Sequence, residues 1–396
     1  MAAKKVTAKA NEPKESVKQL VDQVAKERGI SKESVVEALR EMQKTACKTE
    51  FGKNTDVRVD ITEDTYEISA VLIKEVVELE EDIDDANEQV CLADAKVENP
   101  DAVVGDKVEY PIDLKNLRRV SVSNGVNVFK QKLREAEKKE LYNQFHAREN
   151  DIITGKILRR VSKGWSINIG SVDALLTEAE MTEGEEYKVD MRLKVLILNV
   201  EEKSRGPVVT VSRKRRELVR CLFEQEVAEI SDGTVEIKSI AREPGSRTKM
   251  AVYSHNDSVD PVGSCVGVNG ARVNAIVHEL RGEKIDIVPW DENPGNFIKN
   301  ALSPAQIVNV FADPEEKEAK VIVPDDQLSL AIGKVGQNAR LAAKLTGFKI
   351  DIKSETQASE TDEWGWKISD YMADDDEFEE SYEETFEEGS EESTEE

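Results

Sequence analysis

Apolar residues follow a helical period at the start of the chain and a strand period soon after it. They recur every three or four positions over residues 16–25, which predicts an amphipathic helix that ends before Gly29. Ser31 is a suitable N-cap for a second helix. Strands are predicted at 57–61, 66–77 and 107–112, with the acidic stretch 78–88 as an exposed loop. A charged helix over about 126–147 closes an α+β domain at residues 14–150, where it serves as a connector.

The pattern changes after residue 150, where short apolar runs are separated by Gly or polar turns. Five strands are predicted, at 151–160, 164–169, 173–176, 188–200 and 207–213. Five strands in about 60 residues are typical of an OB barrel, here at residues 151–213. Trp165 could stack on a nucleobase at the barrel surface, or it could be ordinary barrel core. Both interpretations remain open at this point.

The next part of the chain contains one segment twice. Gly267–Gly270 reads G-V-N-G and precedes a helical run and a G-E-K-I-D-I strand; the second copy, G-K-V-G at Gly333–Gly336, precedes a helical run and G-F-K-I-D-I. With 21 Gly in 396 residues, one GxxG is expected about once by chance. A lone copy could be a helical hairpin that needs Gly only for its turn. Two matched copies indicate a duplicated structural unit.

The repeated unit is typical of a KH domain, whose GxxG loop clamps a nucleic-acid backbone. Glycine lets the phosphate approach backbone N–H groups, and the following helix presents its positive N-terminal end. Elsewhere on the chain, Trp165 and Arg213 are added as candidates from the barrel. The candidate RNA-binding residues are Gly267, Val268, Asn269, Gly270, Arg272, Gly333, Lys334, Val335, Gly336, Arg340, Trp165 and Arg213.

The flanking segments complete each unit. A basic helix at 214–229 and strands at 234–242 and 248–254, joined by a type II turn at 243–246, precede the first GxxG. A helix near 296–302 and strands at 305–311 and 317–323 precede the second. Helix-strand-strand-helix-helix-strand is the bacterial variant of the KH fold. The two domains are placed at residues 214–291 and 292–353.

The net charge of −26 comes mostly from one end of the chain. Residues 355–396 contain 19 acidic residues and one lysine, whereas residues 203–220 form a basic strip. A local strip of this kind, not the total charge, indicates a nucleic-acid site. Residues 354–396 are predicted to be a disordered acidic tail, and residues 1–13 are also predicted to be disordered.

Cysteine and histidine are too scattered for a zinc site. The four cysteines form no CxxC pair and the three histidines lie far apart in sequence, so neither a metal nor another cofactor is predicted. No apolar run approaches the ~20 residues of a membrane helix, and the first residues lack the apolar core of a secretory signal. The expectation is a cytoplasmic monomer with reduced thiols and no membrane partner.

An N-terminal domain, an OB barrel and two KH domains in this order resemble the NusA family of bacterial transcription factors. The resemblance covers about residues 14–353, and its most specific stretches lie at 29–33, 153–155, 212–213, 241–249 and 330–338. The first GxxG loop departs from the second because it lacks a lysine. The acidic tail is too short to match the folded acidic repeats of some family members.

The resemblance implies a transcription elongation factor without enzymatic activity. Its N-terminal domain would bind the RNA polymerase core near the RNA exit channel, while the barrel, of the S-one type, and both KH domains would bind nascent single-stranded RNA. Such a factor modulates pausing, intrinsic termination and antitermination, the last together with other Nus proteins.

Two other functions are compatible with KH and OB modules. An RNA-processing enzyme such as polyribonucleotide phosphorylase combines them, but 150 residues before the barrel are too few for its duplicated catalytic core, and no Walker A loop, HExxH or nucleophile elbow is present. A ribosome-associated RNA binder is the second alternative, and the identity of the partner would distinguish it.

Overall fold

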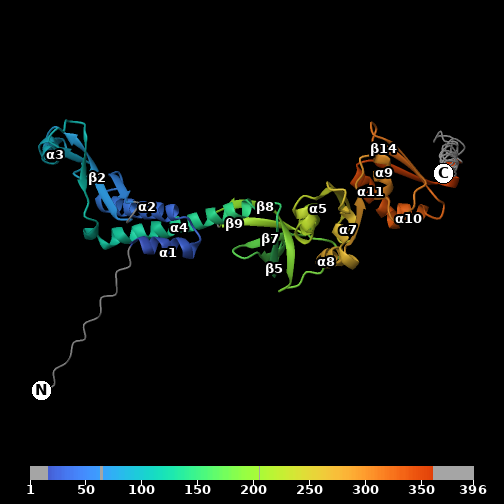
Figure 1. Ribbon diagram of the computed structural model, residues 1–396. Coiled ribbons are helices and arrows are strands. Elements are labelled where there is room, and N and C mark those ends of the chain that lie inside the picture. The colour runs from blue at the N-terminus through green and yellow to red at the C-terminus, as the bar shows by residue number, and fades with distance from the viewer. Residues whose placement is uncertain (1–16, 63–65, 205, 360–396) are drawn as a thin grey trace, which may run out of the picture. The chain divides into compact units, whose positions relative to one another are not determined.

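The computed structural model describes residues 17–62, 66–204 and 206–359 (Figure 1). The chain divides into two units, one of Met1–Ala147 with Val200–Val208 and one of Arg148–Asn199 with Val209–Glu396. The predicted disorder of residues 1–13 and of the acidic tail from residue 360 onward lies outside the described residues.

The N-terminal domain is a four-stranded sheet combined with helices. Its elements are α1 (Val17–Arg28), α2 (Lys32–Phe51), β1 (Asp56–Ile61), β2 (Ile68–Val77), β3 (Gln89–Cys91), α3 (Leu92–Glu98), β4 (Lys107–Pro111) and α4 (Arg119–His146). Strand β2 pairs with β1 and β4 antiparallel and with β3 parallel. The Ser31 side chain accepts a hydrogen bond from Ser34 N, which confirms the predicted N-cap. Neither β3 nor α3 was predicted from the sequence.

Helix α4 begins at Arg119, seven residues before its predicted start. Polar groups at the start of α4 are hydrogen-bonded to another helix. The Glu50 carboxylate of α2 accepts from Arg118 N at 3.1 Å and from Ser121 Oγ at 2.7 Å. These bonds, first that from Ser121, lower the pKa of Glu50. A cap supplied across the fold leaves no local sequence signature, which explains the wrong boundary.

The N-terminal domain is followed in the chain by a closed five-stranded barrel, as predicted. Its strands are β5 (Ile152–Val161), β6 (Gly164–Asn168), β7 (Asp173–Thr177), β8 (Arg192–Lys203) and β9 (Gly206–Ser212). They close in the order β5-β6-β7-β9-β8, and the β7–β9 pair is parallel. Alternate residues such as Ile157, Ile167 and Leu176 are fully buried and fill the barrel. The barrel is therefore a packed core whose outer surface is left for contacts.

Two KH repeats with the predicted element order follow the barrel. The first consists of α5 (Arg216–Glu226), α6 (Ala228–Ser231), β10 (Val235–Glu243), β11 (Arg247–Ser254), α7 (Pro261–Val266), α8 (Ala271–Glu279) and β12 (Lys284–Pro289). The second consists of α9 (Pro294–Ala301), β13 (Asn309–Asp313), β14 (Glu318–Val323), α10 (Leu328–Ile332), α11 (Gln337–Thr346) and β15 (Lys349–Ser354). In each sheet the middle strand pairs antiparallel with the first and parallel with the last.

The second repeat extends beyond its predicted end at residue 353. Helix α12 (Glu355–Ser359) follows β15 directly and buries Ala358. Thr356 Oγ1 donates to Asp325 Oδ2 at 2.5 Å, which ties this helix to the domain. The folded part therefore continues to Ser359, and the boundary of the acidic tail at residue 354 was placed too early.

The barrel and the two repeats share hydrophobic cores. Ile152 and Leu196 of the barrel pack into the core of the first repeat. Ala241, Ala251 and Val288 of the first repeat pack into the core of the second. Since apolar surface is buried at both junctions, the three modules are joined by packing and not only by linkers.

Candidate nucleic-acid interface

The two GxxG loops have the same backbone conformation. The first glycine has φ 74° and ψ 174° at Gly267 and φ 76° and ψ 173° at Gly333, a region that is open essentially to glycine alone. The last glycine is left-handed in both loops, with φ 75° at Gly270 and φ 72° at Gly336. Two segments 66 positions apart thus form one structure, which confirms the duplication inferred from sequence.

The third position of each loop is left-handed without being glycine. Asn269 has φ 52° and Val335 has φ 55°. Asparagine tolerates this region, but a β-branched residue there is a real outlier that costs on the order of 1–3 kcal/mol. The Val335 side chain is also 84 % exposed, as is that of Val268 in the first loop at 83 %. The loop tips therefore combine backbone strain with exposed apolar groups, a combination found at binding sites.

Each loop opens directly into a helix whose first N–H groups lack a side-chain cap. Gly270 is the N-cap of α8 and Gly336 that of α11, and neither can supply an acceptor. The N–H groups of Ala271 and Gln337 donate to Val268 O and Lys334 O within the loop turns, so the positive helix end is what favours an anion at the loop. The arrangement suits a phosphate of a nucleic-acid backbone.

The predicted cations near the loops differ in their availability. Lys334 is exposed within the second loop, and its carbonyl accepts from Gln337 N. Arg340 is half-exposed and donates from Nε to Glu243 at 2.8 Å and from Nη1 to Val335 O at 3.1 Å. It therefore supports the loop while the rest of its guanidinium stays accessible.

Arg272 acts mainly as a brace of the first loop. Its Nη1 donates to Ser264 O at 2.6 Å and to Glu229 at 2.9 Å. At the equivalent place in the second repeat, Asn338 Nδ2 donates to Ala331 O at 3.0 Å. In both repeats the second residue after GxxG ties the start of its helix to the preceding helix.

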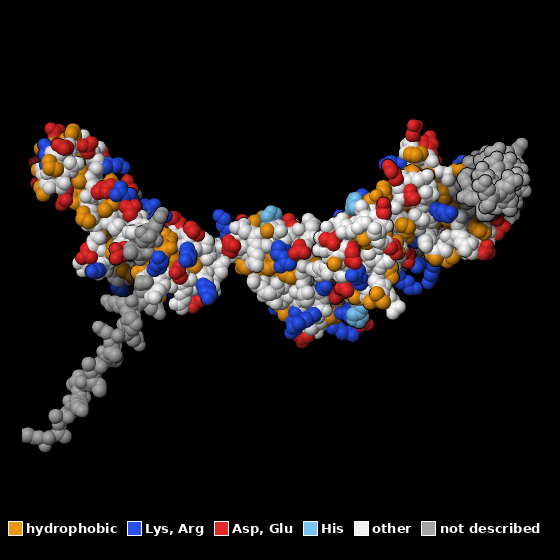
Figure 2. All heavy atoms as spheres, in the orientation of Figure 1, with side chains coloured by type: hydrophobic (Ala, Val, Ile, Leu, Met, Phe, Trp, Pro, Cys, Tyr) orange, Lys and Arg blue, Asp and Glu red, His pale blue; other side chains and the backbone are white. Residues whose placement is uncertain are grey.

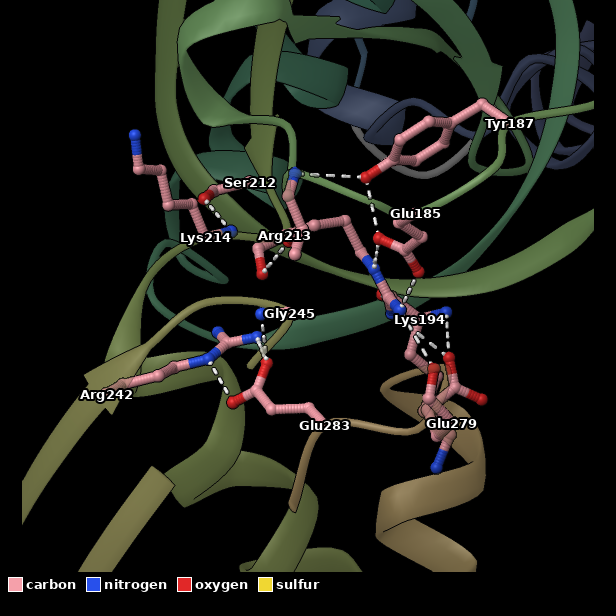
Figure 3. A network of polar contacts seen from close by, with 11 residues as sticks. Glu185, Tyr187, Lys194, Ser212, Arg213, Lys214, Arg242, Gly245, Glu279 and Glu283 are labelled. Carbon is pink, nitrogen blue, oxygen red and sulfur yellow. Dashed lines mark hydrogen bonds and ion pairs between the residues drawn. The ribbon is translucent and has the colours of Figure 1, made fainter. Parts of the chain in front are cut away.

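Arg213 was predicted to contact RNA, and this prediction was wrong. Its side chain is 1 % exposed and lies between Glu185 and Glu279, with Nη2 donating to Glu279 O at 2.8 Å (Figure 3). Lys194 O accepts from Nη1 at 2.7 Å. The buried guanidinium is saturated by protein groups, so Arg213 links the barrel to α8 and offers no donor to a ligand.

A second buried ion pair lies beside this network. Arg242 pairs with Glu283 through Nε and Oε1 at 2.8 Å, with side-chain exposures of 3 % and 0 %. Glu283 also accepts from Gly245 N at 2.8 Å (Figure 3). It accepts as well from Thr248 Oγ1 at 2.6 Å. The turn before β11 is thereby fixed to the loop before β12. Sequence reasoning found the turn but not its anchor.

Trp165 is half-buried on β6, where it pairs in register with Leu176 of β7. Leu176 is fully buried, and residues opposite each other on antiparallel strands share one face. Trp165 therefore lies on the interior face, which favours packing for most of the ring. Only the part that remains accessible could contact a base.

Much of the basic strip is neutralised by nearby carboxylates. Arg215 pairs with Glu180 at 2.6 Å and Arg216 with Glu217 at 3.0 Å. On the face shown in Figure 2, Lys and Arg side chains still gather along the lower edge of the barrel and the KH repeats. The strip contributes to the scaffold more than the sequence suggested.

The part of the chain that the structure describes holds neither a metal cluster nor a membrane-spanning helix. No group of three or more His, Cys, Asp or Glu side chains there is placed to hold a metal ion. Among the described helices, none combines the length and apolarity required to cross a membrane.

A closed barrel followed by two KH repeats with intact GxxG loops defines a nucleic-acid-binding protein of the KH class. Residues 17–139 match the NusA N-terminal domain, residues 213–290 the NusA-like first KH domain, and residues 294–360 the NusA-like second KH domain. The chain belongs to the NusA family of transcription termination/antitermination proteins, as its resemblance implied.

Several relatives carry the name transcription termination/antitermination protein NusA. The Bacillus subtilis protein is 48 % identical over 335 residues, covering 85 % of this chain and 90 % of the relative. The Halalkalibacterium halodurans protein is 47 % identical and covers 85 % and 87 %, respectively. The Thermus thermophilus protein is 40 % identical and covers 86 % and 90 %.

Proposed function

We propose that this chain binds nascent single-stranded RNA through its two GxxG loops and its barrel. The observation that carries the proposal is the shared geometry of the loops, whose angles agree within a few degrees and which both open into uncapped helix starts. A KH loop of this kind clamps the backbone of about four nucleotides. Two such loops and a barrel on one packed unit would hold a longer RNA than any single module.

We further propose that the N-terminal domain binds the RNA polymerase core, so that the chain couples emerging RNA to the enzyme. The match of residues 17–139 to the NusA N-terminal domain supports this assignment. The acidic loop at residues 78–88 would repel phosphate, which fits a protein partner better than RNA. In this role the chain would modulate pausing, termination and antitermination, the last with other Nus proteins, by binding and not by catalysis.

The RNA part of the proposal is tested with the full chain and a labelled single-stranded RNA of about 20 nucleotides. Gly270→Asp combined with Gly336→Asp places carboxylates where phosphates would lie. Both positions have left-handed backbones that Asp tolerates, so the fold should persist. Affinity should fall sharply in fluorescence anisotropy. Wild-type affinity in the folded double variant would contradict the proposed RNA site.

The polymerase part is tested with the same double variant as bait in nuclease-treated bacterial extract. It should capture RNA polymerase as well as the wild-type chain does, because the N-terminal domain is unchanged. Capture of ribosomal subunits in place of polymerase would favour a translational RNA binder. A pause assay with purified polymerase then tests whether adding this chain alters transcription.

A further inference from the structure

The Arg340 guanidinium lies directly beside the second GxxG loop. The position that a Cβ atom would take at Gly336 is 3.8 Å from Arg340 Nη1, and Nη1 donates to Val335 O at 3.1 Å. A phosphate held by this loop would therefore approach the same guanidinium. The orientation of Arg340 decides which of its N–H groups face that phosphate.

Glu243 fixes that orientation from the other KH repeat. It stands at the end of β10, and its Oε1 accepts from Arg340 Nε at 2.8 Å. Its Oε2 accepts from Gln337 Nε2 at 2.7 Å, at the first residue of α11. One carboxylate thus holds two side chains of the helix that the second loop opens.

The backbone of Glu243 is itself held by a hydrogen-bonded turn. Ser246 N donates to Glu243 O at 3.0 Å, which closes the turn after β10, and Ser246 Oγ also contacts Gln337 Nε2 at 2.7 Å. Gly245 N is bonded to the fully buried Glu283. Since the turn is anchored in the core of the first repeat, Glu243 has little freedom to follow a moving Arg340.

The Arg340 guanidinium has enough donors for both Glu243 and a bound phosphate. A guanidinium carries five N–H groups. Nε–H goes to Glu243 and one Nη1–H goes to Val335 O, so three N–H groups on Nη1 and Nη2 remain. The Arg340 side chain is 48 % exposed. The pair with Glu243 therefore leaves the outer edge of the guanidinium able to donate to a phosphate.

We propose that Glu243 is a positioning residue for RNA at the second GxxG loop. It holds Arg340 so that the outer edge of the guanidinium points to the phosphate bound there. This inference rests on the proposed RNA function and assigns part of the second loop's affinity to a residue of the first repeat. An aligned guanidinium loses less side-chain entropy on binding than a free one.

The first loop has no equivalent of the contact between Glu243 and Arg340. Asn274 occupies the position that corresponds to Arg340, and Val268 the position that corresponds to Lys334. Any effect of Glu243 through Arg340 must therefore be confined to the second loop. This asymmetry makes the proposal testable within one chain.

The test measures RNA affinity of the full chain by fluorescence anisotropy with a single-stranded RNA of about 20 nucleotides. Glu243→Ala is compared with Glu236→Ala, which removes a carboxylate from the same strand, where it is paired with Lys238. The control corrects for the loss of one negative charge. We expect Glu243→Ala to weaken binding about 3- to 10-fold relative to the control, the range of a typical single hydrogen bond.

Double-mutant cycles identify the route of the effect. The loss caused by Glu243→Ala should persist with Gly270→Asp and vanish with Arg340→Ala or Gly336→Asp. Glu243→Ala should also lower the slope of log affinity against log salt concentration by about 0.7, the value of one phosphate contact on a single strand. A purely structural role would not move that slope. Should Glu243→Ala not fold, Glu243→Gln replaces it, with weaker binding expected again.

Unchanged or tighter binding of the Glu243 variant would overturn the positioning role, and tighter binding would show that Glu243 competes with phosphate. An equal loss in the Arg340→Ala background would overturn the route through Arg340. Failure of the wild-type chain to bind RNA would instead contradict the proposed function itself. The two failures are therefore distinguishable.

Discussion

Arg213 of the barrel and Glu279 at the end of α8 are joined by two contacts, Nη1 to Oε1 at 3.2 Å and Nη2 to the backbone oxygen at 2.8 Å. Glu279 Oε1 also accepts from Lys194 N at 2.9 Å. Helix α8 begins at the first GxxG loop, so its far end is tied to the barrel. The buried Arg213 thereby links two of the proposed RNA-binding modules.

Replacing Arg213 with Met should strongly destabilise this unit. The change leaves the buried Glu185 without its guanidinium partner, and breaking a buried pair in this way costs about 3–5 kcal/mol. For a unit of this size, that corresponds to a fall in Tm of roughly 10 °C in calorimetry.

Arg215→Ala is the matched control, because Arg215 is exposed and its pair with Glu180 spans the same boundary. An exposed pair contributes at most about 1 kcal/mol, so the control should melt within a few degrees of wild type. Similar melting of the two variants would contradict a stabilising role for the buried network.

The architecture could be predicted because its signals are local or repeated. The GxxG pairs, the G-x-K-I-D-I strands and the turn with Gly245 are short patterns with a direct geometric meaning. Gly245 has φ 77° at the position where a type II turn requires it. The duplicated segment added weight that no single motif could supply.

The roles of charged residues could not be predicted in the same way. Arg213 belongs to a basic strip in sequence, yet its partners Glu185 and Glu279 lie 28 and 66 positions away. Glu243 and Arg340 are 97 positions apart. Whether a cation is exposed or paired depends on such distant contacts, so charge runs indicated a nucleic-acid site without showing which residues are free.

The second GxxG loop should contribute more RNA affinity than the first. It carries Lys334 and is flanked by Arg340, where the first has Val268 and Asn274. Gly336→Asp should therefore weaken binding more than Gly270→Asp, by roughly 30-fold if two phosphate contacts of about 1 kcal/mol are lost. Binding titrations at two salt concentrations measure the difference. Equal losses would show that backbone donors, not these cations, dominate both loops.

Three cysteines should be poorly reactive in the folded chain. Burial raises the pKa of Cys47 and Cys221 to about 11 and that of Cys265 to about 12. At pH 8.5 the thiolate, which is the nucleophile, is then roughly 100-fold rarer than in an unfolded chain for Cys47 and Cys221, and about 1,000-fold rarer for Cys265. Alkylation followed by mass spectrometry should be correspondingly slow, and urea should restore ordinary rates. Rapid alkylation of Cys265 without urea would contradict its burial.

The same thiols should lower stability at alkaline pH. Between about pH 9 and 11–12 the unfolded chain has released these protons while the folded chain retains them. Ionisation then favours the unfolded state, so the free energy of unfolding should fall as pH rises through this window. Denaturation at pH 7.5 and 10 measures the fall, which should be smaller for Cys221→Ser, where the thiol is only partly buried. An equal fall in that variant would assign the effect to other groups.

The acidic tail should compete with RNA for the KH repeats. Residues 360–396 contain 18 carboxylates and one lysine, and they follow a unit whose loops present uncapped helix starts and Lys334. If disordered, as the sequence predicts, about 40 residues span some 35 Å and can reach these groups. The structure shows where to cut: a chain ending at Ser359 keeps α12 and the buried Ala358, whereas an end at residue 353 would remove them.

Truncation after Ser359 should therefore tighten RNA binding at low salt. The gain over the full chain should shrink as salt rises, because screening weakens the attraction between tail and loops within a Debye length of about 10 Å at 0.1 M. A full-length chain with the tail carboxylates changed to amides is the matched control, since it keeps the length and loses the charge. It should bind like the truncated chain. Equal affinity of the full and truncated chains at low and at moderate salt concentration would contradict this competition. The tail would then be a solubilising segment or a tether for a partner, with Trp364 and Trp366 as its anchors.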